Sequence, residues 1–318
     1  IFALQDEIAR TIVEQLRIKL LPGEHAAEQA ETVKFDAYNC YLKGRHFFHM
    51  GTASSLRLAR RLFECSTQSE SGPRYAKAFA GIALCHAQLR TWHADDVPVQ
   101  EILDVASKAL ALDAYLAEAY GMASSLDGKP AEAVNAFEKA IALDPQCYEA
   151  HLYFAWHSLA HGDTGKSAIL YRRAAELQPS DFRSPIYLSS VLHSLGREAE
   201  SREFALLGLE RAEKAFRLHP DSSDAAQIGA CVLASLGESN RAKEMMAQGL
   251  AIDPDALPSK YNAACMHALL GESDQAIALL EEWFSRADPQ ARRWIRFDAD
   301  LASLRQHPRY RVLEETAS

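Results

Sequence analysis

The sequence lacks the motifs by which most enzyme classes and metal sites are recognised. It contains no G-x-x-x-x-G-K-[ST], G-x-G-x-x-G, H-E-x-x-H or G-x-S-x-G pattern. Its six cysteines are widely scattered, and none forms a C-x-x-C pair. A zinc site or a disulfide scaffold is therefore not expected, and reduced thiols in the cytoplasm are the simplest interpretation. We predict no catalytic residue, no cofactor and no metal site in this chain.

The sequence also lacks long apolar runs and an excess of basic residues, and both absences limit the classes of partner. No apolar run approaches the roughly 18–20 residues that a membrane span needs, so no membrane contact is expected. Basic residues are outnumbered, with 34 Lys and Arg against 43 Asp and Glu. A nucleic-acid surface needs clustered Lys and Arg to neutralise phosphates, so this balance argues against nucleic acid as a partner. Hydrophobic residues make up 48% of the chain, which is enough for a large core.

What the sequence does contain is an internal repeat. Glycines in similar turn-like phrases fall at positions 128, 162, 196, 237 and 271, in steps of 34, 34, 41 and 34. A second marker is an apolar phrase that usually ends in proline, and its last residue falls at positions 114, 145, 179, 220 and 254, in steps of 31, 34, 41 and 34. Two independent markers thus agree on a period of 34 residues with one insertion of seven.

Each period has the pattern of a helical hairpin. The glycine suits the left-handed conformation that closes a first helix. The proline is typical of the start of the next helix. Ala133, Phe137 and Ala140 lie at i, i+4 and i+7 on one face of a second helix, and Gly121 supplies the matching small position on the first. The insertion is expected to lengthen the second helix of one unit by about two turns.

This pattern resembles the tetratricopeptide repeat (TPR) family, which pairs small residues with an aromatic residue and a terminal proline. The match is incomplete, because Ala117 and Ser124 stand where that family has Trp and Tyr. The resemblance implies an all-α fold, a TPR α-solenoid in which antiparallel helix pairs form a right-handed superhelix. About seven repeats are expected over residues 34–289, between an N-terminal amphipathic helix and linker at 1–33 and a C-terminal capping segment at 290–318.

The two ends of the chain carry a narrower resemblance. Residues 1–20 form one amphipathic helix pattern, and residues 23–33 are polar and are predicted to be a linker. The phrases "FALQDEIA", "AYNCYLKGRHFF" and "LRQHPRY" resemble a group of bacterial multidomain signalling proteins. In that group a TPR array follows a TolB-like region and an effector, either a class III adenylate/guanylate cyclase or a CadC-type winged-helix domain. We therefore expect this chain to be one part of a longer protein, with neither effector inside it. The charges of "WIRFDAD" at residues 294–300 are expected on solvated helix faces.

The TPR resemblance also implies a concave groove that is lined by the first helices, whose fifth and ninth positions face inward. This frame predicts as groove residues Glu118, Met122, Leu152, Trp156, Ile186, Ser190, Gln227 and Tyr261, together with Cys231 and Cys265. The lining is mostly apolar and lacks the Lys and Asn combination with which chaperone-binding TPR domains hold a carboxylate. An apolar peptide or helix is the better fit. Core packing between units is an equal alternative for Trp156.

Two polar features have plain interpretations. The phrase "HGDTGKS" at residues 161–167 has the wrong glycine spacing for a phosphate loop and falls on a turn between helices. The pairs His46/His49 and His157/His161 each share a helix face, yet nothing nearby completes a metal site. For these histidines we expect polar contacts at helix ends.

We predict a protein–protein interaction scaffold rather than an enzyme. It would be the regulatory or sensory TPR domain of a cytoplasmic bacterial signalling protein, linked to a class III adenylate cyclase domain that is absent from this chain. Its partner would be a protein or peptide, or upstream domains of its own parent protein, and a homodimer is a further alternative. The helix at residues 1–20 is also a candidate occupant of the groove. The rival interpretation is a sensory or dimerisation domain of a winged-helix transcriptional activator.

Overall fold

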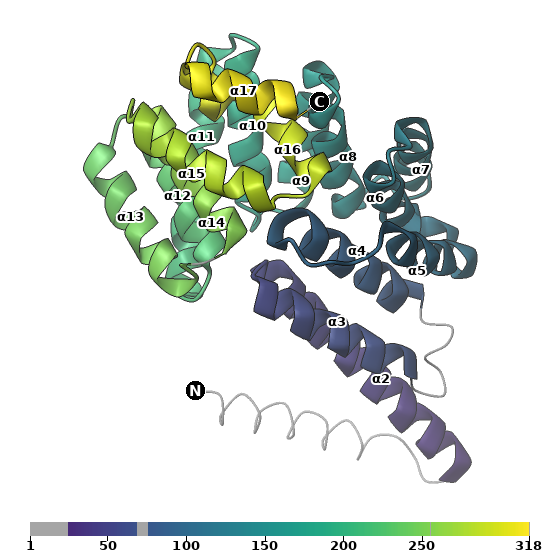
Figure 1. The fold of residues 1–318 in the computed structure, drawn as a ribbon. Coiled ribbons are helices and arrows are strands. Elements are labelled where there is room, and N and C mark those ends of the chain that lie inside the picture. The colour runs from purple at the N-terminus through teal and green to yellow at the C-terminus, as the bar shows by residue number, and fades with distance from the viewer. Residues whose placement is uncertain (1–24, 69–75, 255, 318) are drawn as a thin grey trace.

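A computed structural model describes residues 25–68, 76–254 and 256–317. Within these ranges the chain forms α-helices and short 3₁₀-helices and no strand. Helices α2 to α15 follow one another as seven pairs (Figure 1): α2 (His25–Met50) with α3 (Ala53–Gln68), α4 (Ala76–His93) with α5 (Val99–Leu112), α6 (Ala117–Leu126) with α7 (Pro130–Leu143), α8 (Tyr148–Ala160) with α9 (Thr164–Leu177), α10 (Arg183–Ser194) with α11 (Glu198–Leu218), α12 (Ser223–Ser235) with α13 (Ser239–Ile252), and α14 (Leu257–Leu269) with α15 (Ser273–Arg286). A 3₁₀ turn, η2 (Ala114–Leu116), precedes α6. The predicted all-α solenoid of about seven repeats is confirmed.

The glycine marker closes the first helix of five pairs. Positive φ angles of 70° to 83° occur at Gly128, Gly162, Gly196, Gly237 and Gly271, in the left-handed region that a residue without a Cβ adopts readily.

The proline marker lies in the turns between pairs. The sequence pattern predicts it in the first turn of the next helix, and that prediction is wrong. In the third pair, Asp144 ends α7 and its carboxylate accepts a hydrogen bond from the backbone amide of Gln146 (2.9 Å). Pro145 lies inside this Asx turn, and α8 begins only at Tyr148. The aspartate therefore caps one helix, while the proline shapes the turn that follows.

Small residues allow the helices of a pair to meet around a buried aromatic ring. A Cβ at Gly121 would lie 2.9 Å from the ring of Phe137, and a Cβ at Gly44 or Gly81 would lie 2.7 Å from the ring of Phe63. Both phenylalanines are completely buried. Phe137 also stacks on Phe154 of the next pair at 5.2 Å between ring centroids, so one side chain joins two repeats.

The seven-residue insertion extends one helix. Helix α11 has 21 residues, against 14 in α9 and in α13, so the predicted lengthening by about two turns is confirmed. Gly208 stands where the longer helix crosses α10, and a Cβ there would lie 2.4 Å from Ile186 Cγ1. The glycine therefore permits the close approach of the two helices.

At the N-terminus, the predicted amphipathic helix at residues 1–20 lies outside the described residues. The linker predicted at residues 23–33 is wrong from residue 25 on, because α2 begins at His25 and crosses the predicted boundary at 33. The phrase "AAEQAE" at residues 26–31 consists of strong helix formers, and their propensity outweighs the polarity that suggested a linker.

After the last pair, the chain continues through α16 (Pro289–Arg292), η3 (Arg293–Arg296), η4 (Ala299–Leu304) and α17 (Pro308–Thr316). Helix α17 lies beside α15 (Figure 1), and Arg309 pairs with Glu281 across them. That this part caps the array stays a prediction. Helix η4 instead packs against α14 and α10. The segment between α16 and α17 thus lies inside the superhelix.

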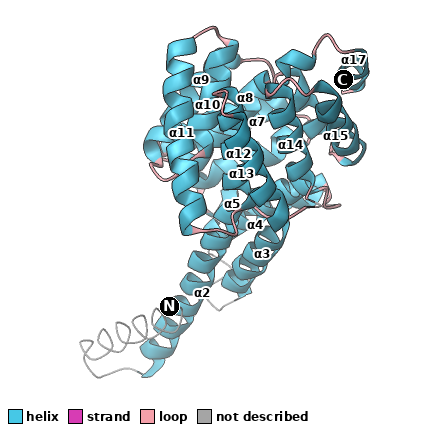
Figure 2. Ribbon diagram, turned by 90° about the vertical axis from the view of Figure 1, so that its left-hand side faces the viewer, coloured by secondary structure: helices cyan, strands magenta, loops and turns pink. Residues whose placement is uncertain are grey.

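Contacts between distant repeats close the superhelix around this segment. Arg45 of α2, in the first pair, forms an ion pair with Glu149 of α8, in the fourth pair, at 2.6 Å. Helix α4 contacts α14, and most of α2 and α3 extends away from the body (Figure 2). None of the described helices combines the length and the apolar character of a membrane span.

Candidate binding groove

The first helices and the segment at residues 294–300 enclose a cavity of about 570 Å³, which we call the central cavity. Six of the eight predicted groove residues line it: Met122 of α6, Leu152 and Trp156 of α8, Ile186 and Ser190 of α10, and Tyr261 of α14. Residues four apart share one helix face, which explains why the pairs on α8 and α10 point to the same space. Whether these side chains bind a partner stays a prediction.

The other two predicted residues lie elsewhere. Glu118 lines a second pocket, beside Arg45 and Glu149, because α2 approaches α6 and α8 at that end of the superhelix. Burial raises the pKa of the Glu118 carboxyl to about 8. Gln227 is buried between α12 and α14, where its amide nitrogen donates to Ser259 Oγ at 2.7 Å. Neither residue faces the central cavity, so the counting frame is wrong at these two positions.

Cys231 and Cys265 line the central cavity as the frame predicts. Both are buried, and burial raises the pKa of each thiol well above its ordinary value. They are therefore protonated and contribute weakly polar surface rather than a reactive thiolate.

Three tryptophans from distant parts of the chain meet at the cavity. Trp156 of α8 stacks on Trp294 of η3, with ring centroids 5.7 Å apart and ring planes 14° from parallel. Trp92 of α4 meets both rings edge-on, at 6.2 and 6.4 Å. Trp156 is half-buried, and its indole N–H has no hydrogen-bond partner among the described residues. The two alternatives for Trp156 therefore coincide, since it packs on Trp294 and also lines the cavity.

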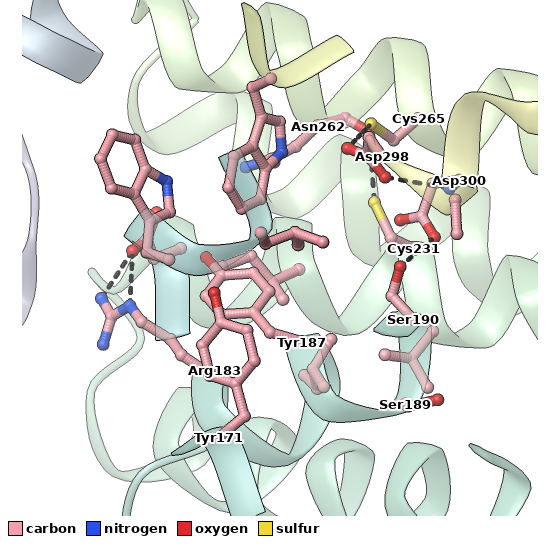
Figure 3. Close-up of a pocket in the computed structure, with 18 of the residues that line it drawn as sticks. Tyr171, Arg183, Tyr187, Ser189, Ser190, Cys231, Asn262, Cys265, Asp298 and Asp300 are labelled. Atoms are coloured by element: carbon pink, nitrogen blue, oxygen red, sulfur yellow. Dashed lines mark hydrogen bonds and ion pairs between the residues drawn. The ribbon is translucent and has the colours of Figure 1, made fainter. Parts of the chain in front are cut away.

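The "WIRFDAD" segment carries polar contacts that the sequence did not suggest. Tyr261 donates a hydrogen bond to Asp298 Oδ2 at 2.6 Å, and the backbone amide of Asp300 donates to Asp298 Oδ1 at 2.9 Å. Ser190 lies 3.4 Å from Asp300 Oδ1. Figure 3 shows Asp298 and Asp300 close to Cys231, Cys265 and Ser190. The prediction that these charges lie on a solvated helix face is wrong for both aspartates, because the segment folds back onto α10 and α14.

One ion pair forms another part of the wall. The guanidinium of Arg183 donates two hydrogen bonds to Asp224 Oδ2, at 2.5 and 3.2 Å, and thereby joins α10 to α12. Asp224 and the other nearby acids hold the pKa of Arg183 above its usual range, although desolvation by burial opposes them. Sequence reasoning missed this pair because its two members are 41 residues apart and no local pattern links them.

His157 and His161 make polar contacts, one with a neighbouring repeat and one within α8. His157 Nδ1 lies 2.8 Å from Ser125 Oγ, and His161 Nδ1 lies 2.8 Å from the carbonyl oxygen of His157 at the end of α8. Burial lowers the pKa of His157 to about 4. Asp163 accepts a hydrogen bond from the Lys166 amide and caps α9, so "HGDTGKS" is the predicted turn between helices. No group of three metal-ligating side chains occurs in the part of the chain that the structure describes.

Comparisons with known proteins agree with this architecture. The tetratricopeptide repeat family model matches residues 116–147, which cover α6, α7 and the turn after α7. Human IFIT1, in a dimer solved with PPP-AAAA, has a TM-score of 0.53 at 15% identity, over 84% of this chain and 68% of that chain. YrrB, described as a TPR protein with an unusual peptide-binding site, has a TM-score of 0.37 at 18% identity, over 57% of this chain and 91% of that chain. The described residues form an α-solenoid of the tetratricopeptide-repeat type.

One curated relative is named putative adenylate cyclase 3, from Rhizobium meliloti (strain 1021). The two sequences are 30% identical over 115 residues, which is 36% of this chain. The match covers only 20% of that relative, so most of the relative's sequence lies outside the matched region.

Proposed function

We propose that this chain is the recognition part of a bacterial signalling protein and that it binds a protein or peptide segment in its concave groove. The mechanism is recognition alone: side chains on successive first helices contact successive positions of the bound segment. We assign it no catalytic role.

The observation that carries this proposal is the way in which the groove already holds a short segment of the same chain. Trp156 stacks on Trp294, while Tyr261 and Ser190 contact the carboxylates of Asp298 and Asp300. These groove side chains come from three different repeats and contact positions spread over seven residues. A peptide from a partner with an aromatic residue followed by acids would meet the same chemistry.

We further propose that the parent protein is a class III adenylate cyclase that acts in the cytoplasm. The name of the curated relative supports the cyclase, and the resemblance of the chain ends to cyclase-linked TPR proteins points the same way. Protonated thiols at Cys85, Cys231 and Cys265 suit a reducing compartment. The net charge of −9 favours a protein partner over nucleic acid.

An affinity purification from bacterial lysate tests the groove. Wild type is compared with Leu152→Ala, which shortens a groove side chain, and with Leu206→Ala, which makes the same change at an exposed position of α11. Partner segments are mapped by cross-linking, and their affinity is measured by calorimetry. We expect a segment that Leu152→Ala loses and Leu206→Ala retains, with unchanged circular dichroism melting in both. A partner that cross-links only outside the groove contradicts the proposal.

The cyclase link has its own test. The gene is sequenced upstream of this region, and the full-length product is assayed for cyclic nucleotide synthesis with and without Trp156→Ala. A cyclase domain whose activity responds to the substitution supports the link. A winged-helix domain upstream would instead make the parent a transcriptional activator.

A further inference from the structure

We propose that the central cavity binds a small organic cation that carries a second polar group at its other end. This site goes beyond peptide recognition, because it uses the space that remains when the chain's own segment at residues 294–300 is in place. Its volume of about 570 Å³ lies within the range of small-molecule sites, which is roughly 300–1,000 Å³.

The first argument is an excess of negative charge in the wall. Arg183 is neutralised by Asp224, and Glu149 is neutralised by Arg45. Of the other charged lining residues, Glu198 lies 3.0 Å from His193 Nδ1 and Arg202 is exposed. No cationic side chain among the described residues pairs with Asp298 or Asp300, which lie on one short segment. The buried pair is costly to ionise fully without a counter-charge, which favours a proton on one of the two carboxyls, and a cation that enters the cavity takes the place of that proton, which is released to solvent.

The two aspartates differ in how well they are already satisfied. Asp298 accepts hydrogen bonds from the Tyr261 hydroxyl and the Asp300 amide, at 2.6 and 2.9 Å. The Asp300 carboxyl accepts one side-chain contact, from Ser190 Oγ at 3.4 Å, which is long for a hydrogen bond. Asp300 lines the cavity and keeps some accessible surface there. It is therefore the group that a ligand ammonium would meet.

The second argument is independent of charge and comes from buried polar atoms without partners. The hydroxyl of Tyr171 is completely buried, borders the cavity and has no hydrogen-bond partner among the described residues. The indole N–H of Trp156, on the same wall, also has none. Unsatisfied buried groups of this kind are rare in folded proteins and point to a missing partner. A hydroxyl or carbonyl group of a ligand would supply it.

The third argument is the aromatic wall between these two ends. Tyr187 lies beside Tyr171, with ring centroids 5.6 Å apart, and Trp156 and Trp294 stack nearby. Figure 3 shows Tyr171 and Tyr187 together on one side and the two aspartates on the other. Aromatic faces attract organic cations and pack against apolar ligand bodies. The arrangement selects an amine at the aspartates, an apolar body along the rings and a polar group at Tyr171.

Three para-substituted phenols, whose side chains end in a cation, a neutral group or an anion, test the proposal by isothermal titration calorimetry. Tyramine carries an ammonium, 4-ethylphenol is neutral and 3-(4-hydroxyphenyl)propionate carries a carboxylate on a similar phenol. With wild-type protein we expect tyramine to bind about tenfold more tightly than 4-ethylphenol, and the propionate to bind most weakly. Equal affinities for tyramine and the propionate, or no saturable binding of tyramine at millimolar concentration, overturn the proposal.

Two variants locate the site. Asp300→Asn keeps the shape of the side chain and should remove the preference for tyramine over 4-ethylphenol, whereas Glu203→Gln, at an exposed position outside the cavity, should leave it intact. Tyr171→Phe deletes an unpartnered hydroxyl and should weaken all three phenols severalfold while the charge preference remains. Unchanged tyramine affinity in both cavity variants overturns the assignment. Because none of these measurements involves a protein partner, their failure would leave the peptide-binding proposal standing.

Discussion

We predict that the substitution Asp300→Asn changes how the free energy of unfolding depends on pH. Burial raises the pKa of the Asp300 carboxyl from 3.8 to about 8, and the charge of Asp298 adds to this effect. The other groups that face it are neutral: the Ser190 hydroxyl on α10 and the thiols of Cys231 and Cys265 on α12 and α14. The folded state therefore binds a proton that the unfolded chain has released by pH 7.

The sign and size follow from proton linkage. Since the folded pKa is the higher one, the native protein is favoured at low pH, and this stability is lost as pH rises from about 4 to about 8. The slope within that window is about 1.4 kcal/mol per pH unit, which gives up to about 3 kcal/mol between pH 5 and pH 7. Hydration of the cavity makes this an upper value. Asparagine does not titrate, so the variant should gain stability over wild type as pH rises.

Urea unfolding followed by circular dichroism at pH 5, 6, 7 and 8 measures this difference. We expect the free energy of unfolding of Asp300→Asn minus that of wild type to increase steadily across the series. Glu203→Gln, whose wild-type carboxylate is exposed, should run parallel to wild type. A constant difference between Asp300→Asn and wild type would refute the conclusion that the Asp300 carboxyl is held protonated by its surroundings.

Three further predictions concern packing. Phe137→Ala should cost about 3–5 kcal/mol in urea unfolding, because the ring is completely buried between two repeats. Gly121→Ala should cost about 1–3 kcal/mol, since the new Cβ would lie 2.9 Å from that ring, whereas Gly165→Ala at an exposed position of α9 should be neutral or stabilise by about 0.5 kcal/mol. Equal effects of the two glycine substitutions on the melting temperature would contradict this reasoning. Tyr310→Phe should cost about 1–3 kcal/mol, because its buried hydroxyl donates to the Ile295 carbonyl at 2.7 Å; an unchanged unfolding midpoint would contradict it.

The repeat architecture could be predicted because its signals are local. A glycine with positive φ recurs at the end of the first helix in most units, and aspartate caps and buried rings recur in several of them, so the sequence period becomes the structural period. The effect of the insertion could be predicted for the same reason, because seven extra residues in a helical pattern extend α11. The prediction of a linker failed at residues 25–33, but the information needed was local there too, because the helix propensity of these residues favours α2.

The site was harder to predict because its contacts are non-local. Trp92 and Trp294 are about 200 positions apart, and nothing in "WIRFDAD" distinguishes a segment that enters the superhelix from one that lies on its surface. The fifth and ninth positions placed eight residues at the cavity, yet Glu118 faces a different pocket, which residues of α2 also line. A frame taken from the family describes each repeat but not the way in which this superhelix closes.

That closure bears on how a binding event could be transmitted. In an open solenoid each repeat contacts only its neighbours, so a ligand on one repeat has little effect on a distant one. Here Arg90 of the second pair forms an ion pair with Asp288 at 2.8 Å, six residues before Trp294 meets the second and fourth pairs. We expect a ligand in the central cavity to strengthen these long-range contacts and a peptide that replaces Trp294 to break them. The two proposed ligands would therefore act in opposite directions on one element, the segment at residues 288–300, whose contacts link distant repeats of the array.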